Sequence, residues 1–191
     1  MTAASGLLHK EYHEQGFSEQ GGLFQMVQLW VNLPARFKMT PPKYQEITQG
    51  LMGQYHLEGD AGTIEIIAGE YGGVKGPATT FTPMHVMNAR LKKGAKVDFR
   101  FPENYNTGLL VVEGSAIILG SEVATDHFVL LKNDGEGFGI EANEESIVLI
   151  LSGEPIQEPI AQYGPFLMNK WEELEQAIAD VSAGKFGTLE N

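Results

Sequence analysis

Apolar and polar residues alternate in short runs along most of the chain, and glycine or proline separates the runs. In residues 95–101, Val97, Phe99 and Phe101 fall on one face and charged residues fall on the other, as in a half-buried β-strand. The same kind of pattern predicts strands at 24–33, 63–68, 84–91, 95–101, 109–112, 115–119, 128–131 and 146–151. Short strands separated by glycine turns indicate an all-β sandwich or barrel, the class that contains Greek-key jelly rolls.

One helix is predicted near the C-terminus. Asn169 is a suitable N-cap with Glu172 three residues later, and Gly184 favours the end of the helix. Four apolar side chains share one face at helical spacing: Trp171, Leu174, Ile178 and Val181. We interpret this face as one that docks on the barrel, with a partner-binding helix as the alternative. The preceding residues, 155–168, are predicted to form an extended strap with a tight turn at 163–166.

Composition narrows the class of protein. The 191 residues are 42% hydrophobic, which is sufficient for a core, and the net charge of −12 argues against binding to nucleic acid or to anionic membranes. The absence of cysteine excludes disulfides, thiolate nucleophiles and cysteine-based metal sites. No apolar run reaches the roughly 18 residues of a membrane helix, and the first residues do not form a secretory signal. We therefore expect a cytoplasmic protein.

The candidate chemistry begins with His9 and Glu11. On a strand these residues share a face with their Cα atoms about 6.6–6.8 Å apart, so an imidazole and a carboxylate can converge on one divalent metal. His13 lies on the same face but about 13 Å from His9. Two ligands are fewer than a non-haem iron site normally has, and an exposed polar strand near a chain end is the alternative.

The remaining histidines, His56, His85 and His127, are dispersed and show no ligand spacing. His85 alternates with apolar neighbours, which is typical of a hydrogen-bonded histidine at the edge of a core. The chain contains no nucleotide-binding, nucleophile-elbow or zinc-protease motif. The residues alone therefore predict an acidic β-barrel protein with one candidate metal pair.

Four longer segments together resemble the pirin family: MTAASGLLHKEY, GGLFQMVQLWVNLPARFKMTPPKYQEI, IIAGEYGGVKGPA and GEPIQEPIAQYGPFLMNKWEELEQAIADVSAGKFG. The LWVNLP…PPKYQEI and EPIAQYGPFLMN parts are the most specific. The resemblance covers nearly the whole chain and implies a cupin fold with two barrels in tandem. It implies a remnant of the N-terminal barrel at 1–48, a metal-free C-terminal barrel at 49–154, and the strap with the helix at 155–191. Ala4 stands where the family usually has a turn glycine, which is costly if φ is positive there.

The resemblance also implies the site. The family's His-x-Glu ligand pair falls on His9 and Glu11, while its His-x-His pair lies upstream of the point where this chain begins. We therefore expect an incomplete ligand set for Fe(II) or another divalent metal. In the second barrel, Arg100 and Pro102 stand where the general cupin pattern has histidines.

The implied function is an iron-dependent quercetin 2,3-dioxygenase acting on a small aromatic, flavonol-like substrate. Glu11 would serve as a base toward the substrate hydroxyl, and we expect the activity to be impaired in this chain. The alternative is a non-enzymatic interaction or regulatory module, whose partner is another protein or a second copy of the chain. A third hypothesis is an inactive fragment.

Overall fold

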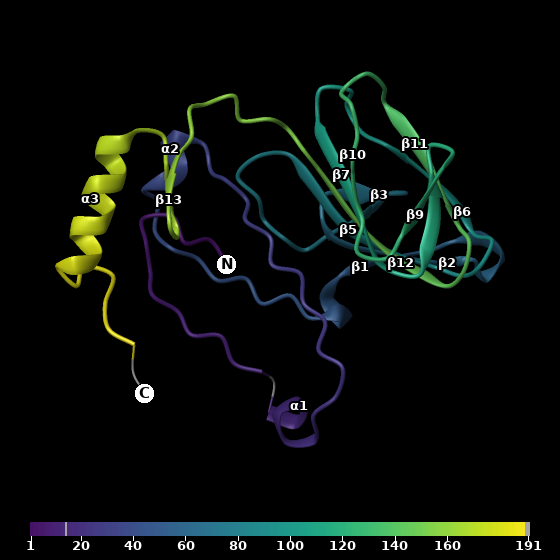
Figure 1. The fold of residues 1–191 in the computed structure, drawn as a ribbon, viewed down its shortest axis with the longest axis horizontal. Coiled ribbons are helices and arrows are strands. Elements are labelled where there is room, and N and C mark those ends of the chain that lie inside the picture. Colours follow the sequence, from purple (N-terminus) through teal and green to yellow (C-terminus); the bar gives the residue numbers. More distant parts are fainter. Residues whose placement is uncertain (14, 190–191) are drawn as a thin grey trace. The chain divides into compact units, whose positions relative to one another are not determined.

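The computed structural model describes residues 1–13 and 15–189. The chain forms two compact units (Figure 1): a barrel unit, Gln45–Pro155, and a terminal unit made of Met1–Tyr44 and Ile156–Asn191. The two ends of the chain thus share a unit. The functional division into 1–48, 49–154 and 155–191 stays a prediction.

The barrel unit contains two antiparallel sheets (Figure 1), one of six strands in the order β1-β2-β5-β12-β7-β10 and one of four in the order β6-β11-β8-β9. The larger sheet comprises β1 (Gly53–His56), β2 (Gly62–Ala68), β5 (Met84–Leu91), β7 (Asn106–Glu113), β10 (Phe128–Leu130) and β12 (Ser146–Gly153). The smaller comprises β6 (Lys96–Arg100), β8 (Ser115–Ile118), β9 (Ser121–Ala124) and β11 (Gly137–Ala142). A small hairpin of β3 (Glu70–Tyr71) and β4 (Val74–Lys75) and two 3-10 turns, η1 (Gln49–Leu51) and η2 (Glu58–Asp60), complete the unit.

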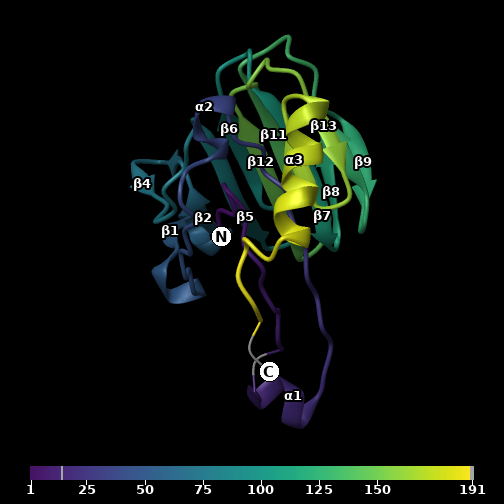
Figure 2. The same cartoon turned by 90° about the vertical axis from the view of Figure 1, so that its left-hand side faces the viewer.

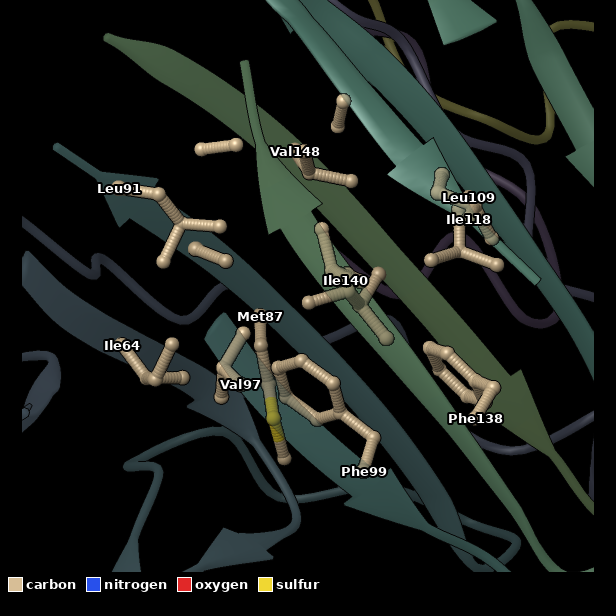
Figure 3. Packing of buried hydrophobic residues seen from close by; sticks show 14 of the residues in the cluster. Ile64, Met87, Leu91, Val97, Phe99, Leu109, Ile118, Phe138, Ile140 and Val148 are labelled. Carbon is tan, nitrogen blue, oxygen red and sulfur yellow. The ribbon is translucent and has the colours of Figure 1, made fainter. Parts of the chain in front are cut away.

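The core of the barrel unit lies between the two sheets. Alternate residues of each strand point inward, so apolar side chains from both sheets meet. Figure 3 shows Ile64, Met87, Leu109 and Val148 of the larger sheet beside Val97, Phe99, Ile118, Phe138 and Ile140 of the smaller one. The all-β class predicted from the alternation is confirmed.

Seven of the eight predicted strands are present. The pattern missed the short strands β1 and β9, the two small hairpins β3–β4 and β13–β14, and the longer β11, which begins Gly-Phe-Gly. Glycine has low strand propensity, so neighbouring strands rather than local sequence determine that Gly137–Ala142 pairs with both β6 and β8.

The strand predicted at 24–33 is wrong. The structure has neither helix nor strand at residues 21–34 (Figure 1), and Leu23, Met26 and Trp30 are exposed. A strand forms only where a neighbouring strand accepts its backbone hydrogen bonds. Residues 24–33 do alternate apolar and polar side chains, but within the described residues no strand pairs with this segment.

The described part of the terminal unit forms three helices and a hairpin: α1 (Gln15–Gln20), α2 (Ala35–Lys38), β13 (Ala161–Tyr163), β14 (Phe166–Met168) and α3 (Trp171–Ser182). The predicted turn at 163–166 closes the β13–β14 hairpin, where an extended strap was expected. Within the described residues no helix has the length and apolar character needed to cross a membrane.

Helix α3 is the C-terminal helix predicted from the sequence, with two differences. Its N-cap is Lys170 and not Asn169, because the carboxylate of Glu173 rather than Glu172 accepts the backbone N–H groups of Asn169 and Lys170, at 3.1 and 2.9 Å. Gly184, with φ +71°, ends the helix as predicted.

The apolar face of α3 packs on β13 and β14 of its own unit, beside which it lies in Figure 2. Docking of this face on the barrel stays a prediction. Leu174 is only 1% exposed, whereas Trp171 is 57% exposed. The buried face is therefore narrower than the four-residue stripe in the sequence.

Candidate functional site

The first six residues are fixed against the segment that follows α2. Thr2 and Lys43 form an antiparallel bridge, and the Ser5 N–H donates to the carbonyl oxygen of Thr40 at 3.1 Å. These bonds tie residues 2–5 to the segment that carries Thr40 and Lys43. Residues 7–13, which carry the candidate metal pair, continue from this anchored start.

A tight turn redirects the chain just before the candidate pair. The Gly6 N–H donates to the Ala3 carbonyl oxygen at 2.9 Å, and Ala4 has φ +43°. Gly6 has φ +109°, and a Cβ on it would lie 2.4 Å from the ring of Phe186. Gly6 is therefore required both for its backbone conformation and for the close approach of the C-terminal segment.

His9 and Glu11 point toward each other. Their Nδ1 and Oε1 atoms are 3.8 Å apart, with the side chains 44% and 63% exposed. The local backbone is irregular and not the strand that the spacing argument assumed. The two side chains nevertheless converge, as a shared ion requires.

The ring of His13 packs in a different environment from the His9–Glu11 pair, beside two phenylalanine rings. Its ring lies 4.6 Å from the ring of Phe24 and 5.5 Å from that of Phe17, measured between centroids. An imidazole held by two aromatic rings contributes to local packing. His13 therefore has a structural role in a small aromatic cluster.

The donor set fits a metal only in part. An imidazole nitrogen and a carboxylate oxygen suit Fe(II) and related divalent ions. Among residues 1–13 and 15–189, however, no three His, Asp or Glu side chains gather so that they could hold a metal ion. Catalytic sites of this kind use at least three protein ligands, so the described residues do not complete one.

A buried polar cluster, which sequence reasoning missed, joins the two halves of the terminal unit. The ammonium of Lys38 donates to Asn32 Oδ1 at 2.6 Å and to the Leu167 carbonyl oxygen at 3.2 Å. Glu158 accepts the Ala35 N–H at 2.6 Å. No sequence pattern marks Lys38, because Leu167 is 129 residues away.

Lys38 is 5% exposed, which is unusual for a lysine. Burial lowers the pKa of Lys38, and the charges of Glu158 and Glu173 partly offset that effect. The cluster thus places a cation between α2 and the C-terminal hairpin, with its donors directed to two oxygens. It positions the segment to which residues 2–5 are bonded.

The three histidines of the barrel unit remain apart from one another. His56 contacts Thr63 Oγ1 at 3.1 Å, and His127 contacts the Thr125 carbonyl oxygen at 3.0 Å. The ring of His85 lies 4.7 Å from that of Phe101, and burial lowers the pKa of His85. No shared ion is indicated by these positions.

Strand β6 shows what occupies the barrel interior. Phe99 is buried in the core and Phe101 is nearly so, while Arg100 lies on the exposed face between them. Phe99 and Phe101 therefore belong to the apolar core, while Arg100, at a position where the general cupin pattern has a histidine, is exposed. The chemistry of this interior is apolar.

The comparisons with known proteins fit this combination of an apolar jelly-roll barrel with a C-terminal helix. The profile of the Pirin C-terminal cupin domain matches residues 86–187, more than half of the chain. The chain belongs to the pirin family. Its fold is that of a cupin, with mostly β structure and one long C-terminal helix.

Pirin relatives match over almost the entire chain. A protein of Pseudomonas aeruginosa named "Putative quercetin 2,3-dioxygenase" is 43% identical over 187 residues, covering 97% of this chain and 65% of the relative. A pirin-like protein of Solanum lycopersicum is 36% identical, covering 98% of this chain and 63% of the relative. The crystal structure of quercetin 2,3-dioxygenase from Acinetobacter baumannii superposes with a TM-score of 0.94 at 42% identity, covering 99% of this chain and 66% of that one.

The chain thus spans about two thirds of the length of these relatives. Any activity that a relative's name states belongs to a longer protein. For this pirin the activity, substrate and metal are matters for proposal.

Proposed function

We propose that this chain is part of a metal-dependent pirin with quercetin 2,3-dioxygenase activity, in which His9 and Glu11 are two of the metal ligands. The observation that supports the proposal is the convergence of His9 Nδ1 and Glu11 Oε1 to 3.8 Å. Their partly exposed side chains leave room for an ion and a substrate. Fe(II) is the metal that we propose, and it would supply a Lewis acid for a flavonol oxygen.

The two residues have different proposed roles. The Glu11 carboxylate is the proton acceptor for the substrate hydroxyl, because a carboxylate within hydrogen-bond reach of a phenolic proton can take it up. The His9 imidazole supplies nitrogen ligation only. The remaining ligands come from outside the described residues, as the resemblance to the family implies.

A metal titration tests the assignment of the two ligands. The isotope-labelled chain is titrated anaerobically with Fe(II), and broadening of backbone and side-chain NMR signals is followed. We expect weak binding, with broadening centred on residues 7–13, that is lost in His9→Ala and in Glu11→Gln. The control His56→Ala, which removes an exposed histidine of the barrel unit, should leave the titration unchanged.

Catalysis is tested separately. Because two protein ligands hold a metal weakly, we expect this chain with added Fe(II) to turn over little quercetin, measured by the loss of its absorbance and by oxygen uptake. Robust turnover would contradict the expected impairment of this chain, and metal binding that survives His9→Ala would contradict the proposed site.

One observation favours a second candidate function, a non-enzymatic protein-interaction module. Residues 23–31 expose several large apolar side chains: Leu23, Phe24, Met26, Val27, Leu29, Trp30 and Val31. Contiguous apolar surface of this kind commonly marks an interaction site. A pull-down partner sensitive to Trp30→Ser and Met26→Ser, from a chain without bound metal, would support this function over the first.

A further inference from the structure

The barrel unit contains a cavity at the side where its two sheets end. The edge strands there are β10 of the larger sheet and β9 of the smaller one. Ser121 and Val123 line the cavity from β9, and Val129 and Leu130 line it from β10. The volume is about 570 Å³, within the roughly 300–1,000 Å³ that small-molecule sites occupy.

The inner wall of this cavity is part of the hydrophobic core. Phe101, Ile118, Val123 and Phe138 all line it, and each is at most 8% exposed. The rings of Phe101 and Phe138 lie 6.1 Å apart, tilted by 45°. Two tilted aromatic rings and branched aliphatic side chains form a wall that suits a flat apolar molecule.

The rim of the cavity is polar and slightly acidic. Lys132, Asp134 and Glu136 line it, giving one cation and two carboxylates. The whole chain has a net charge of −12, so the surrounding potential disfavours an anionic ligand. Carboxylates and the hydroxyl of Tyr105, also in the lining, instead suit a ligand that carries neutral hydroxyl groups.

The turn between β8 and β9 provides a second, independent observation. Leu119 and Gly120 form its two-residue loop with φ +49° and +78°. Positive φ at both positions is the signature of a type I′ turn, which strongly prefers Asn-Gly. Leucine is disfavoured in the left-handed region, and the side chain of Leu119 is 64% exposed.

Leucine at position 119 is thus disfavoured both by the backbone conformation of the turn and by the exposure of its apolar side chain to water. The same side chain lines the cavity. Backbone strain of this kind is typical of ligand-binding positions. We propose that the cavity between β9 and β10 binds a small, neutral, hydroxylated aromatic molecule, which Leu119 covers. None of the lining residues belongs to the terminal unit, so binding does not depend on His9, Glu11 or a metal.

Isothermal titration of the full chain with 2-naphthol, in buffer containing EDTA, tests the proposal. We expect saturable one-to-one binding, and roughly tenfold weaker binding of 2-naphthoate because of its charge. Ser121→Trp should fill the cavity and weaken 2-naphthol binding by about tenfold or more. Glu122→Trp, on the opposite face of the same strand, is the matched control and should bind normally.

Leu119→Asn separates a ligand role from a structural one. Asparagine suits the type I′ turn, so this variant should raise the melting temperature while it weakens 2-naphthol binding by roughly fivefold. If Leu119 served only the structure of the turn, Leu119→Asn would leave 2-naphthol binding unchanged.

Should Ser121→Trp fail to fold, methyl NMR of the unaltered chain gives the answer. Shifts on 2-naphthol addition confined to the methyl-bearing lining residues support the site: Ile118, Leu119, Val123, Val129, Leu130 and Leu131. The absence of saturable binding, methyl shifts elsewhere, or binding unchanged in both Leu119→Asn and Ser121→Trp would overturn it.

Discussion

At the scale of single residues, strain is concentrated where the chain turns. Ala4 and Leu119 both have positive φ, at +43° and +49°, although neither residue type favours that region. The two positions differ in what surrounds them. Leu119 lines a cavity, whereas Ala4 lies in a turn that serves only to direct the chain toward His9.

Ala4→Gly should therefore stabilise the terminal unit by about 0.5–1 kcal/mol, because relief of left-handed strain outweighs the added entropy of the unfolded chain. Urea denaturation followed by tryptophan fluorescence measures the change. Ala3→Gly, next to it in the turn, is the matched control and should destabilise the unit by a similar amount. Destabilisation by Ala4→Gly would show that the backbone there carries no strain.

At the scale of elements, a buried carboxylate connects three segments of the barrel unit. Glu65 of β2 accepts hydrogen bonds from Gln49 of η1 at 2.7 Å and from Asn88 of β5 at 3.4 Å, and pairs with Arg90 of β5 at 3.0 Å. Burial acts to raise the pKa of Glu65. Four interactions together outweigh this effect: the hydrogen bonds from Gln49 and Arg90, the charge of Arg90, and the hydrogen bond from Asn88. The net result is a lowered pKa.

This network predicts a specific loss of stability in acid. Because the folded pKa lies below the usual 4.5, the stabilisation is complete above that pH and is lost as the pH falls toward the folded value. Glu65→Gln should cost about 2 kcal/mol at pH 7 and reduce the dependence of unfolding free energy on pH below 4.5. Glu122→Gln, on an exposed strand face, is the control, and equal pH slopes in wild type and Glu65→Gln would contradict the account.

At the scale of the whole molecule, the two units differ greatly in their cores. Every buried hydrophobic residue found in the described chain belongs to the barrel unit, apart from Leu174 of α3. Burial of apolar surface is the main stabilising contribution to folding. The terminal unit should therefore be the less stable of the two.

Thermal unfolding can separate the units, because both tryptophans, Trp30 and Trp171, lie in the terminal unit. We expect the fluorescence transition at a lower temperature than the loss of β-sheet circular dichroism. Leu174→Ala should lower the fluorescence midpoint, at a cost of about 2–5 kcal/mol, and leave the circular-dichroism midpoint in place. Coincident transitions in both proteins would show that the units unfold together.

The sequence by itself determined whatever depends on neighbours in the chain. Alternation predicted eight strands, of which seven form, and the all-β class, and helical spacing with Gly184 predicted α3. The spacing of His9 and Glu11 predicted that they share the face of a strand; the backbone there is irregular, and their side-chain atoms lie 3.8 Å apart. Their identity as metal ligands stays a prediction.

Only the tertiary structure decided the features that depend on distant segments. Lys38 is buried because Leu167 and Glu158 come from the other end of the chain. Residues 24–33 do not form a strand in the described structure, because alternation specifies which side chains share a face but not whether a neighbouring strand is present to pair with the segment. The cavity arises where β9 and β10 both end their sheets, since long-range pairing, which no local pattern encodes, determines which strands become edges.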